Sequence, residues 1–196
     1  ITMNVPLRVN FYKTIDGVPY YRTNGTPTDC MKLGEKVVLK GRQIDLVLSG
    51  INHGSNSSVS LLYSGTMAAA IEATFDNIPA VGISLQDYSA DADFTACVHY
   101  GKIIVQQVLE KGIPPYISLN VNFPKAPLEE IKGIKITRQT KGYWHEDMAR
   151  VREGNLIISA QYFDEPLKNR YYEKWHDSIN FDEYGAGYYS TILTSC

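Results

Sequence analysis

Apolar and polar positions along the chain predict strands and helices in turn. Residues 44–49 form a nearly continuous apolar run, which is typical of a strand buried on both faces of a parallel sheet. Residues 64–77 and 91–111 carry apolar positions at helical spacing, and apolar or alternating segments follow each of them at 79–85 and 116–124. The order of strand, helix, strand, helix, strand predicts an α/β fold with a doubly wound, mostly parallel sheet of the Rossmann-like, three-layer type.

The segment before this core has a different pattern. Residues 7–13 and 18–22 flank an Asp-Gly turn and predict a β-hairpin. Residues 26–40 begin with Thr-Pro, which suits the N-cap and the first position of a helix. We therefore expect a hairpin and a helix ahead of the first buried strand.

The last third of the chain predicts further strands without long helices between them. Its strand candidates are residues 134–138, 156–160 and 188–193. We expect one domain over residues 1–196, with an α/β core at about 1–127 and a C-terminal antiparallel β extension at about 128–196. The extension is rich in Tyr and Trp, which suits a contact between subunits; a second layer of core is the alternative.

Composition and charge exclude several classes of function. The chain has 19 basic and 21 acidic residues and a formal net charge of −2, so no global field favours nucleic acid or an anionic membrane. The apolar stretches are shorter than the roughly 20 residues of a membrane-spanning helix. Cys30, Cys97 and Cys196 form no Cys-x-x-Cys pair, which fits a reducing compartment. We expect a cytoplasmic protein with no nucleic-acid partner and no membrane partner.

Candidate ligand-binding residues follow the apolar run at 44–49. Gly50 and Asn52 come at the carboxyl end of the predicted strand, where open α/β sheets bind ligands. The side-chain oxygen of Asn52 is a ligand of the type that Mg²⁺, Mn²⁺ or Ca²⁺ accepts, but such ions normally need one or two carboxylates as well. The alternative is that Asn52 stabilises the loop by hydrogen-bonding its own backbone. His53 is suited to a general acid or a phosphate contact, or to a plain surface position.

The helix that follows offers a site for an anion. Ser64, Gly65 and Thr66 open it, and the first N–H groups of a helix lack intrahelical partners while its dipole favours negative charge. Gly65 would let a phosphate approach the backbone, whereas Ser64 as a simple N-cap is the alternative interpretation. Because Asn52 and Asn56 precede this helix closely, the combination favours a metal and phosphate site.

Short sequence blocks along the first three quarters of the chain carry a family resemblance. In chain order they are Gly25-Thr26-Pro27-x-Asp29-Cys30-x-Lys32-Leu33, Ser49-Gly50-Ile51-Asn52-x-Gly54-x-Asn56, Tyr63-Ser64-Gly65-Thr66-x-Ala68-Ala69-Ala70-x-Glu72, Leu119-Asn120-Val121-Asn122-x-Pro124 and Thr137-Arg138-Gln139. With these blocks in this order, the sequence resembles the SurE family, the survival protein E group of metal-dependent 5'/3'-nucleotidases.

The resemblance implies hydrolysis of nucleoside 5'- or 3'-monophosphates with one divalent ion, Mg²⁺ or Mn²⁺, per subunit. It implies that Asn52 is a metal ligand and that a phosphate-binding and substrate-binding set comprises Gly50, Asn56, Ser64, Gly65 and Thr66. It also implies a homodimer or homotetramer formed through the C-terminal extension. The alternatives are a non-catalytic nucleotide-binding or scaffold relative, and a broad acid phosphatase or exopolyphosphatase.

The sequence also departs from the family pattern. In the family, two adjacent aspartates and a loop serine that bind the metal precede the position of Ile1, and the chain opens on Ile rather than Met. We therefore expect an Asp-Asp segment upstream of Ile1 in a longer polypeptide and expect activity only when it is present, so no catalytic residue is assigned in this sequence. Residues 57–60 lack the acidic side chains that are frequent there in the family, and residues 150–180 match it weakly.

Overall fold

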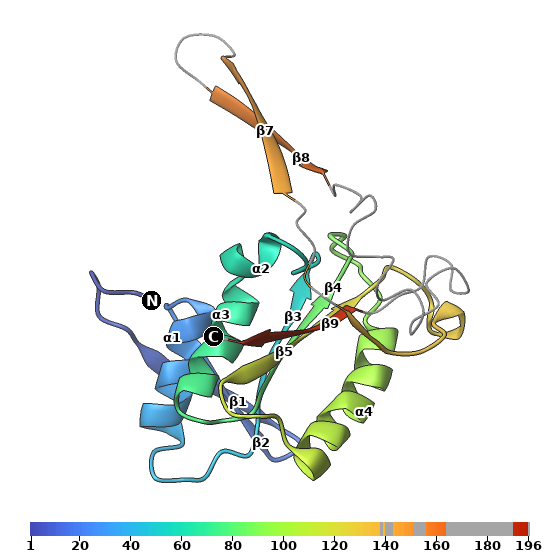
Figure 1. The fold of residues 1–196 in the computed structure, drawn as a ribbon. Coiled ribbons are helices and arrows are strands. Elements are labelled where there is room, and N and C mark those ends of the chain that lie inside the picture. Colours follow the sequence, from blue (N-terminus) through green and yellow to red (C-terminus); the bar gives the residue numbers. More distant parts are fainter. Residues whose placement is uncertain (138, 140–142, 151–155, 164–189, 196) are drawn as a thin grey trace.

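Parallel strands form the centre of the structure, a computed structural model that describes residues 1–137, 139, 143–150, 156–163 and 190–195. They lie side by side in one sheet as β3 (Val47–His53), β4 (Ala80–Leu85) and β5 (Ile117–Phe123). Every residue of β4 is buried, as expected for a strand covered on both faces. The sheet and its crossover helices confirm the predicted doubly wound α/β core (Figure 1).

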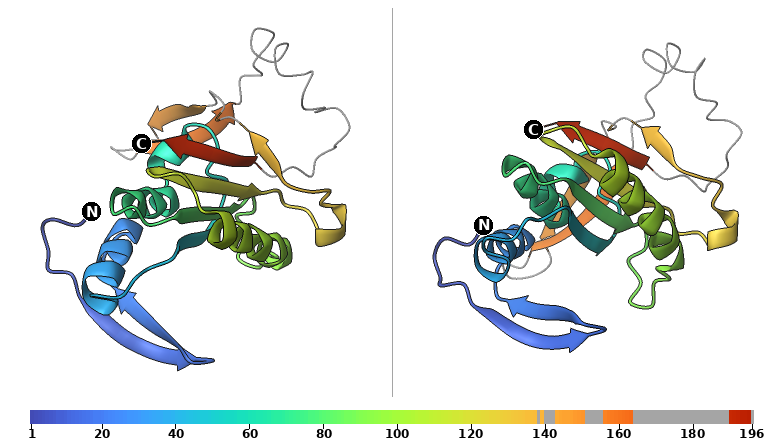
Figure 2. Two further views of the ribbon diagram at one scale, coloured as in Figure 1. Left: turned by 60° about the horizontal axis from the view of Figure 1, so that its bottom comes forward. Right: turned by 90° about the horizontal axis from the view of Figure 1, so that it is seen from below.

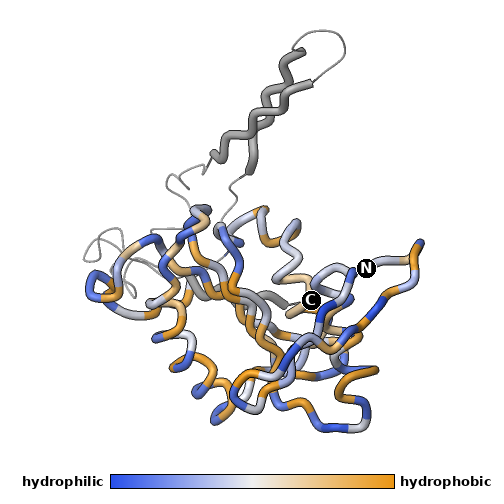
Figure 3. Tube along the Cα trace, turned by 180° about the vertical axis from the view of Figure 1, so that it is seen from behind, coloured by the Kyte–Doolittle hydropathy of each residue, from blue (hydrophilic) through white to orange (hydrophobic). Residues whose placement is uncertain are grey.

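Helices cover the two faces of this sheet. On β4, Gly82 faces α3 (Gly65–Phe75), because a Cβ at Gly82 would lie 2.3 Å from the Met67 sulfur. The alternate residue Ile83 packs in the cluster that contains α4 (Thr95–Lys111), so α3 and α4 lie on opposite faces (Figure 2). Figure 3 shows apolar residues along the strands and on the helices that flank them. Among the described residues, no helix is long and apolar enough to cross a bilayer.

The helix α1 (Pro27–Leu33) begins as its sequence predicts. The Thr26 hydroxyl accepts a hydrogen bond from the Asp29 N–H at 3.3 Å, and the Asp29 carboxylate accepts one from the Thr26 N–H at 2.8 Å. This reciprocal pair is a capping box with a proline at the first helical position. The chain continues from α1 into a π-helical turn, η1 (Gly34–Val38), so the regular helix ends earlier than expected.

The predicted N-terminal hairpin is present as β1 (Val9–Ile15) and β2 (Val18–Thr23), which pair antiparallel. Its turn places Asp16 and Gly17 at φ of 49° and 80°, the positive values that a tight hairpin turn of this type requires. Figure 2 shows the hairpin as a separate two-stranded sheet beside α1.

The C-terminal part adds strands to the sheet and one separate hairpin. β9 (Ser190–Ser195) pairs antiparallel with β5, as expected, whereas β6 (Lys135–Thr137) pairs parallel with β9. β7 (Tyr143–Arg150) and β8 (Leu156–Phe163) form a hairpin that extends away from the sheet (Figure 1). The sequence predicted β8 but not β7, whose polar residues lack clear alternation.

Two short helices complete the described elements. α2 (Ser60–Tyr63) lies directly before α3, and the 3-10 turn η2 (Leu128–Glu130) lies between β5 and β6. Neither was predicted, because runs of three or four residues are too short for a periodic signal.

Candidate functional site

The candidate site lies where β3 ends, at the carboxyl edge of the parallel strands. Asp45 accepts a hydrogen bond from Gln43 at 3.0 Å in the segment before β3. The strand begins later than predicted and runs through the candidate residues Gly50 and Asn52. Gly50 has a φ of +123°, and a Cβ there would lie 2.3 Å from the Ile83 carbonyl oxygen. Only glycine therefore fits this close approach of β3 to β4.

Asn52 is oriented by its own loop. Its side-chain nitrogen donates to the Gly54 carbonyl at 2.9 Å and to the Asn56 side-chain oxygen at 3.4 Å. Within the part of the chain that the structure describes, its Oδ1 oxygen accepts no hydrogen bond. The two interpretations of Asn52 are therefore compatible: the nitrogen holds the loop, and the oxygen is available to a ligand.

A buried network of polar side chains holds the loop after β3. The Asn56 N–H donates to Asn122 Oδ1 at 2.7 Å, and Asn120 Nδ2 donates to the Asn56 carbonyl at 2.8 Å. Asn122 Nδ2 donates in turn to Asn120 Oδ1 at 3.0 Å. Because a buried polar group costs about 1–3 kcal/mol when it loses its partner, these bonds fix the backbone around Asn56.

Asn56 itself is almost fully buried, with 4% of its surface exposed. Its Nδ2 donates to the Ser84 hydroxyl of β4 at 2.5 Å. The nearby Ser58 carbonyl accepts a hydrogen bond from Gln139 Nε2 at 2.7 Å, which brings Gln139 to the same loop. The structure thus gives Asn56 a positioning role, and its contact with phosphate stays a prediction.

The N-terminus of α3 lies at the same edge of the sheet, because the crossover helix runs back from the end of β3 (Figure 1). Ser64 Oγ accepts a hydrogen bond from the Met67 N–H at 3.1 Å, which makes Ser64 the N-cap. A Cβ at Gly65 would lie 3.0 Å from Pro27 Cγ, so this glycine allows α1 and α3 to pack closely. The N–H groups of Gly65 and Thr66 belong to the first turn, where the helix supplies no acceptor.

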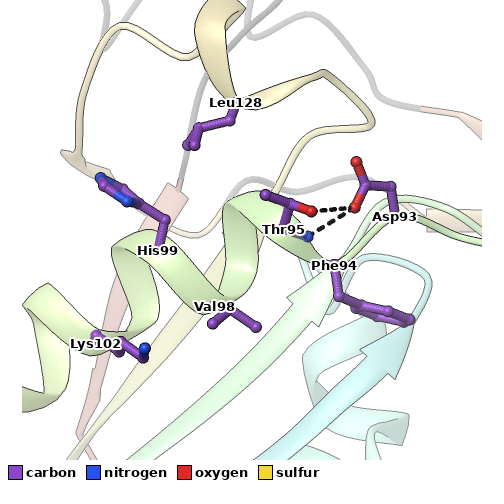
Figure 4. A pocket seen from close by; sticks show the side chains of 7 residues that line it. All are labelled: Asp93, Phe94, Thr95, Val98, His99, Lys102 and Leu128. Carbon is purple, nitrogen blue, oxygen red and sulfur yellow. Dashed lines mark hydrogen bonds between the residues drawn. The ribbon is translucent and has the colours of Figure 1, made fainter.

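His53, the last residue of β3, and the start of α4 lie next to this arrangement. His53 is exposed, and its ring contacts Phe94 edge to face with 5.1 Å between centroids. Asp93 Oδ1 accepts a hydrogen bond from the Thr95 N–H at 2.9 Å, so α4 begins at Thr95 rather than at residue 91. Asp93, Phe94 and Thr95 are among the residues that line a pocket beside α4 (Figure 4), and none of the lining residues belongs to the Asn52 loop.

The charges at this edge bear on whether a cation fits there. Within the described ranges, no group of three or more His, Cys, Asp or Glu side chains could hold a metal ion. Asn52 supplies one neutral oxygen, which fits one position of a Mg²⁺ or Mn²⁺ coordination shell. A divalent cation bound here would therefore need carboxylates in addition to the described residues.

The parallel sheet, the oriented Asn52 and the capped helix α3 define an α/β domain of the doubly wound class with a candidate ligand site at its carboxyl edge. A family model described as survival protein SurE matches residues 1–146, and the chain belongs to this family.

Relatives and a solved structure agree with this assignment. The chain is 52% identical over 146 residues to the 5'-nucleotidase SurE of Cytophaga hutchinsonii, covering 74% of this chain and 56% of the relative. It is 39% identical over 179 residues to the 5'-nucleotidase SurE of Bacteroides fragilis, covering 89% and 69%. The crystal structure of the SurE protein from Aquifex aeolicus superimposes with a TM-score of 0.75 at 32% identity, covering 100% of this chain and 75% of that one. The chain thus spans only part of the length of these relatives.

The sequence reasoning missed several residues of the site, chiefly Asn120 and Asn122. The sequence did contain a signal for them, because these two asparagines alternate with apolar residues in a strand that is mostly buried. Such residues need hydrogen-bond partners inside the protein. The identity of the partner, a loop more than 60 residues earlier, was not readable from the strand.

Proposed function

We propose that this chain belongs to a metal-dependent phosphomonoesterase that hydrolyses nucleoside 5'- or 3'-monophosphates to nucleoside and phosphate. The observation that carries the proposal is Asn52, whose amide nitrogen is engaged by its loop while its oxygen is available at the carboxyl edge of the sheet. Relatives named 5'-nucleotidase SurE, one of them 52% identical over 146 residues, support the same activity.

Each candidate residue has a role in this proposal. Asn52 Oδ1 would bind one divalent ion, Mg²⁺ or Mn²⁺, together with carboxylates outside the described residues. When bound, the ion would neutralise phosphate charge and polarise the phosphoryl group. Ser64, Gly65 and Thr66 would donate to the phosphate oxygens from the start of α3, where fixed donors stabilise developing negative charge.

Two further residues shape the proposed site. Gly50 allows the backbone path that presents Asn52, and Asn56 holds the loop while remaining a candidate phosphate contact.

We further propose that the C-terminal part, about 128–196, contributes to a homodimer or homotetramer, and that the protein acts in the cytoplasm.

The proposal is tested by phosphate release from nucleoside monophosphates by the full-length protein, with Mg²⁺ or Mn²⁺ added and with a chelator. Asn52→Ala is expected to lower kcat/KM at least about a hundredfold, because it removes a ligand oxygen of the ion. Asn10→Ala, in the exposed β1 strand, is the matched control and should retain full activity. Wild-type protein that binds nucleotide but never releases phosphate would instead identify a non-catalytic relative.

A further inference from the structure

Tyr88 is a large aromatic side chain that lies exposed next to the Asn52 loop. It belongs to the connection between β4 and α4, and 71% of its surface is exposed. The ring contacts the backbone of Gly54, since a Cβ at Gly54 would lie 2.4 Å from Tyr88 Cε1 and 2.6 Å from its Cζ. Gly54 is also the residue whose carbonyl accepts the hydrogen bond from Asn52. Tyr88 thus lies against the loop that orients the proposed metal ligand.

Hydrogen bonds fix the backbone on both sides of Tyr88. Asp87 is 7% exposed, and its carboxylate accepts hydrogen bonds from the Ser89 N–H at 3.0 Å, from the Ser89 hydroxyl and from Lys125 Nζ at 3.1 Å. The Ser89 hydroxyl and N–H, with Lys125, lower the pKa of Asp87 to about 2, so the carboxylate is charged at neutral pH. Tyr88 therefore projects from a turn whose shape is set before any ligand arrives.

The position of this turn suits the part of a nucleotide that lies beyond its phosphate. Asn52 and His53 of β3 pair with Ser84 and Leu85 of β4, so these two strands end side by side, about 4.8 Å apart. A phosphate bound between Asn52 and the start of α3 would leave the rest of the molecule to extend along this edge. Tyr88 is the exposed aromatic side chain on the loop that leaves β4 there.

We propose that Tyr88 forms a nucleobase subsite, in which its ring stacks on the base of a nucleoside monophosphate whose phosphate is bound beside Asn52. This inference rests on the proposed function and makes Tyr88 a specificity-determining residue for it. Stacking of a base on an aromatic side chain contributes binding without reading the hydrogen-bonding edge of the base. The subsite therefore accepts all four bases and favours purines, which present the larger flat surface.

The experiment compares AMP with ribose 5-phosphate, which has the same phosphate and sugar but no base. The full-length protein with Mn²⁺ is assayed for kcat/KM on both compounds, and its binding of each is measured by calorimetry. Tyr88→Ala is expected to weaken AMP binding and lower kcat/KM for AMP about 5- to 100-fold, while the values for ribose 5-phosphate change less than about twofold. Tyr88→Phe keeps the ring and should restore AMP to the wild-type level.

Tyr20→Ala provides the matched control, because Tyr20 is an exposed tyrosine on the separate β1–β2 hairpin. Equal losses for AMP and ribose 5-phosphate in Tyr88→Ala, or no loss for AMP, would overturn the subsite while leaving the nucleotidase intact. AMP that binds without turnover, and binds more weakly in Tyr88→Ala, would support the subsite and reject the enzyme. A wild-type protein that neither binds nor hydrolyses AMP would reject both.

Discussion

Truncation of Asn122 to alanine is expected to destabilise the protein by loosening the loop that carries Asn56. Asn122 is 5% exposed, accepts the Asn56 N–H at 2.7 Å and donates to Asn120 Oδ1 at 3.0 Å. The substitution leaves those two buried groups without partners, at about 1–3 kcal/mol each. Water that enters the vacated space recovers part of this cost, so we expect the free energy of unfolding to fall by about 2–4 kcal/mol.

Urea denaturation of the full-length protein, followed by circular dichroism, measures this change. Asn10→Ala should shift the free energy of unfolding by no more than about 0.5 kcal/mol, because the residue is exposed on β1. Asn120→Ala should also lower the free energy of unfolding. The loss in the double variant should be smaller than the sum of the two single losses by about 0.5–3 kcal/mol, because both side chains belong to one network. A loss below about 0.5 kcal/mol in Asn122→Ala, or strict additivity in the double variant, would refute the network argument.

Other substitutions test separate parts of the structure. Gly50→Ala is expected to lower the free energy of unfolding by at least about 2 kcal/mol in denaturation experiments, because the new Cβ would meet a backbone oxygen at 2.3 Å. Gly41→Ala is the control: Gly41 has a φ of +77° but open space around it, so the loss should be only about 1 kcal/mol. Asp87 has a pKa of about 2 in place of its ordinary 3.8, so its stabilising effect is present above about pH 4 and is lost as the pH falls toward 2. The midpoint of thermal unfolding, measured from pH 2 to 7, should depend less on pH in Asp87→Asn than in the wild-type protein. Lys32→Met removes an ion pair with Glu72 in which the lysine side chain is 45% exposed. Because exposed ion pairs contribute little, the free energy of unfolding should change by less than about 1 kcal/mol, and a larger change would contradict this expectation.

Local signals predicted the elements that depend on neighbours in the sequence. The cap at Thr26 and the end of α4 at Gly112 need only residues within one helical turn, and both were predicted correctly. The end of β3 depends on pairing with β4 instead. Gly50 and Asn52 disfavour a strand by themselves, yet parallel pairing to Ser84 and Leu85 extends β3 through them to His53.

The candidate site was predictable in type but not in its contacts. Asn52 and the capped start of α3 follow from the sequence, because both lie next to a recognisable strand or helix. Gly65 was expected to admit a phosphate, and the structure shows a further reason for it, the close contact with Pro27. Contacts of this kind join segments far apart in the chain, so a pattern within one segment carries no information on them.

The hydrogen bonds of the loop also limit what a ligand at this edge can be. The backbone N–H and carbonyl of Asn56 are used by Asn122 and Asn120, and its side chain already serves Ser84 and Asn52. Besides the second hydrogen on Asn56 Nδ2, the groups that remain for a ligand are an acceptor, the Asn52 oxygen, and the donors at the first turn of α3. An anion satisfies the donors but repels the lone pairs of the acceptor, and a cation alone does the reverse. A cation bound to an anion would satisfy both, and for this reason we propose a metal-bound phosphate at this edge rather than either ion alone.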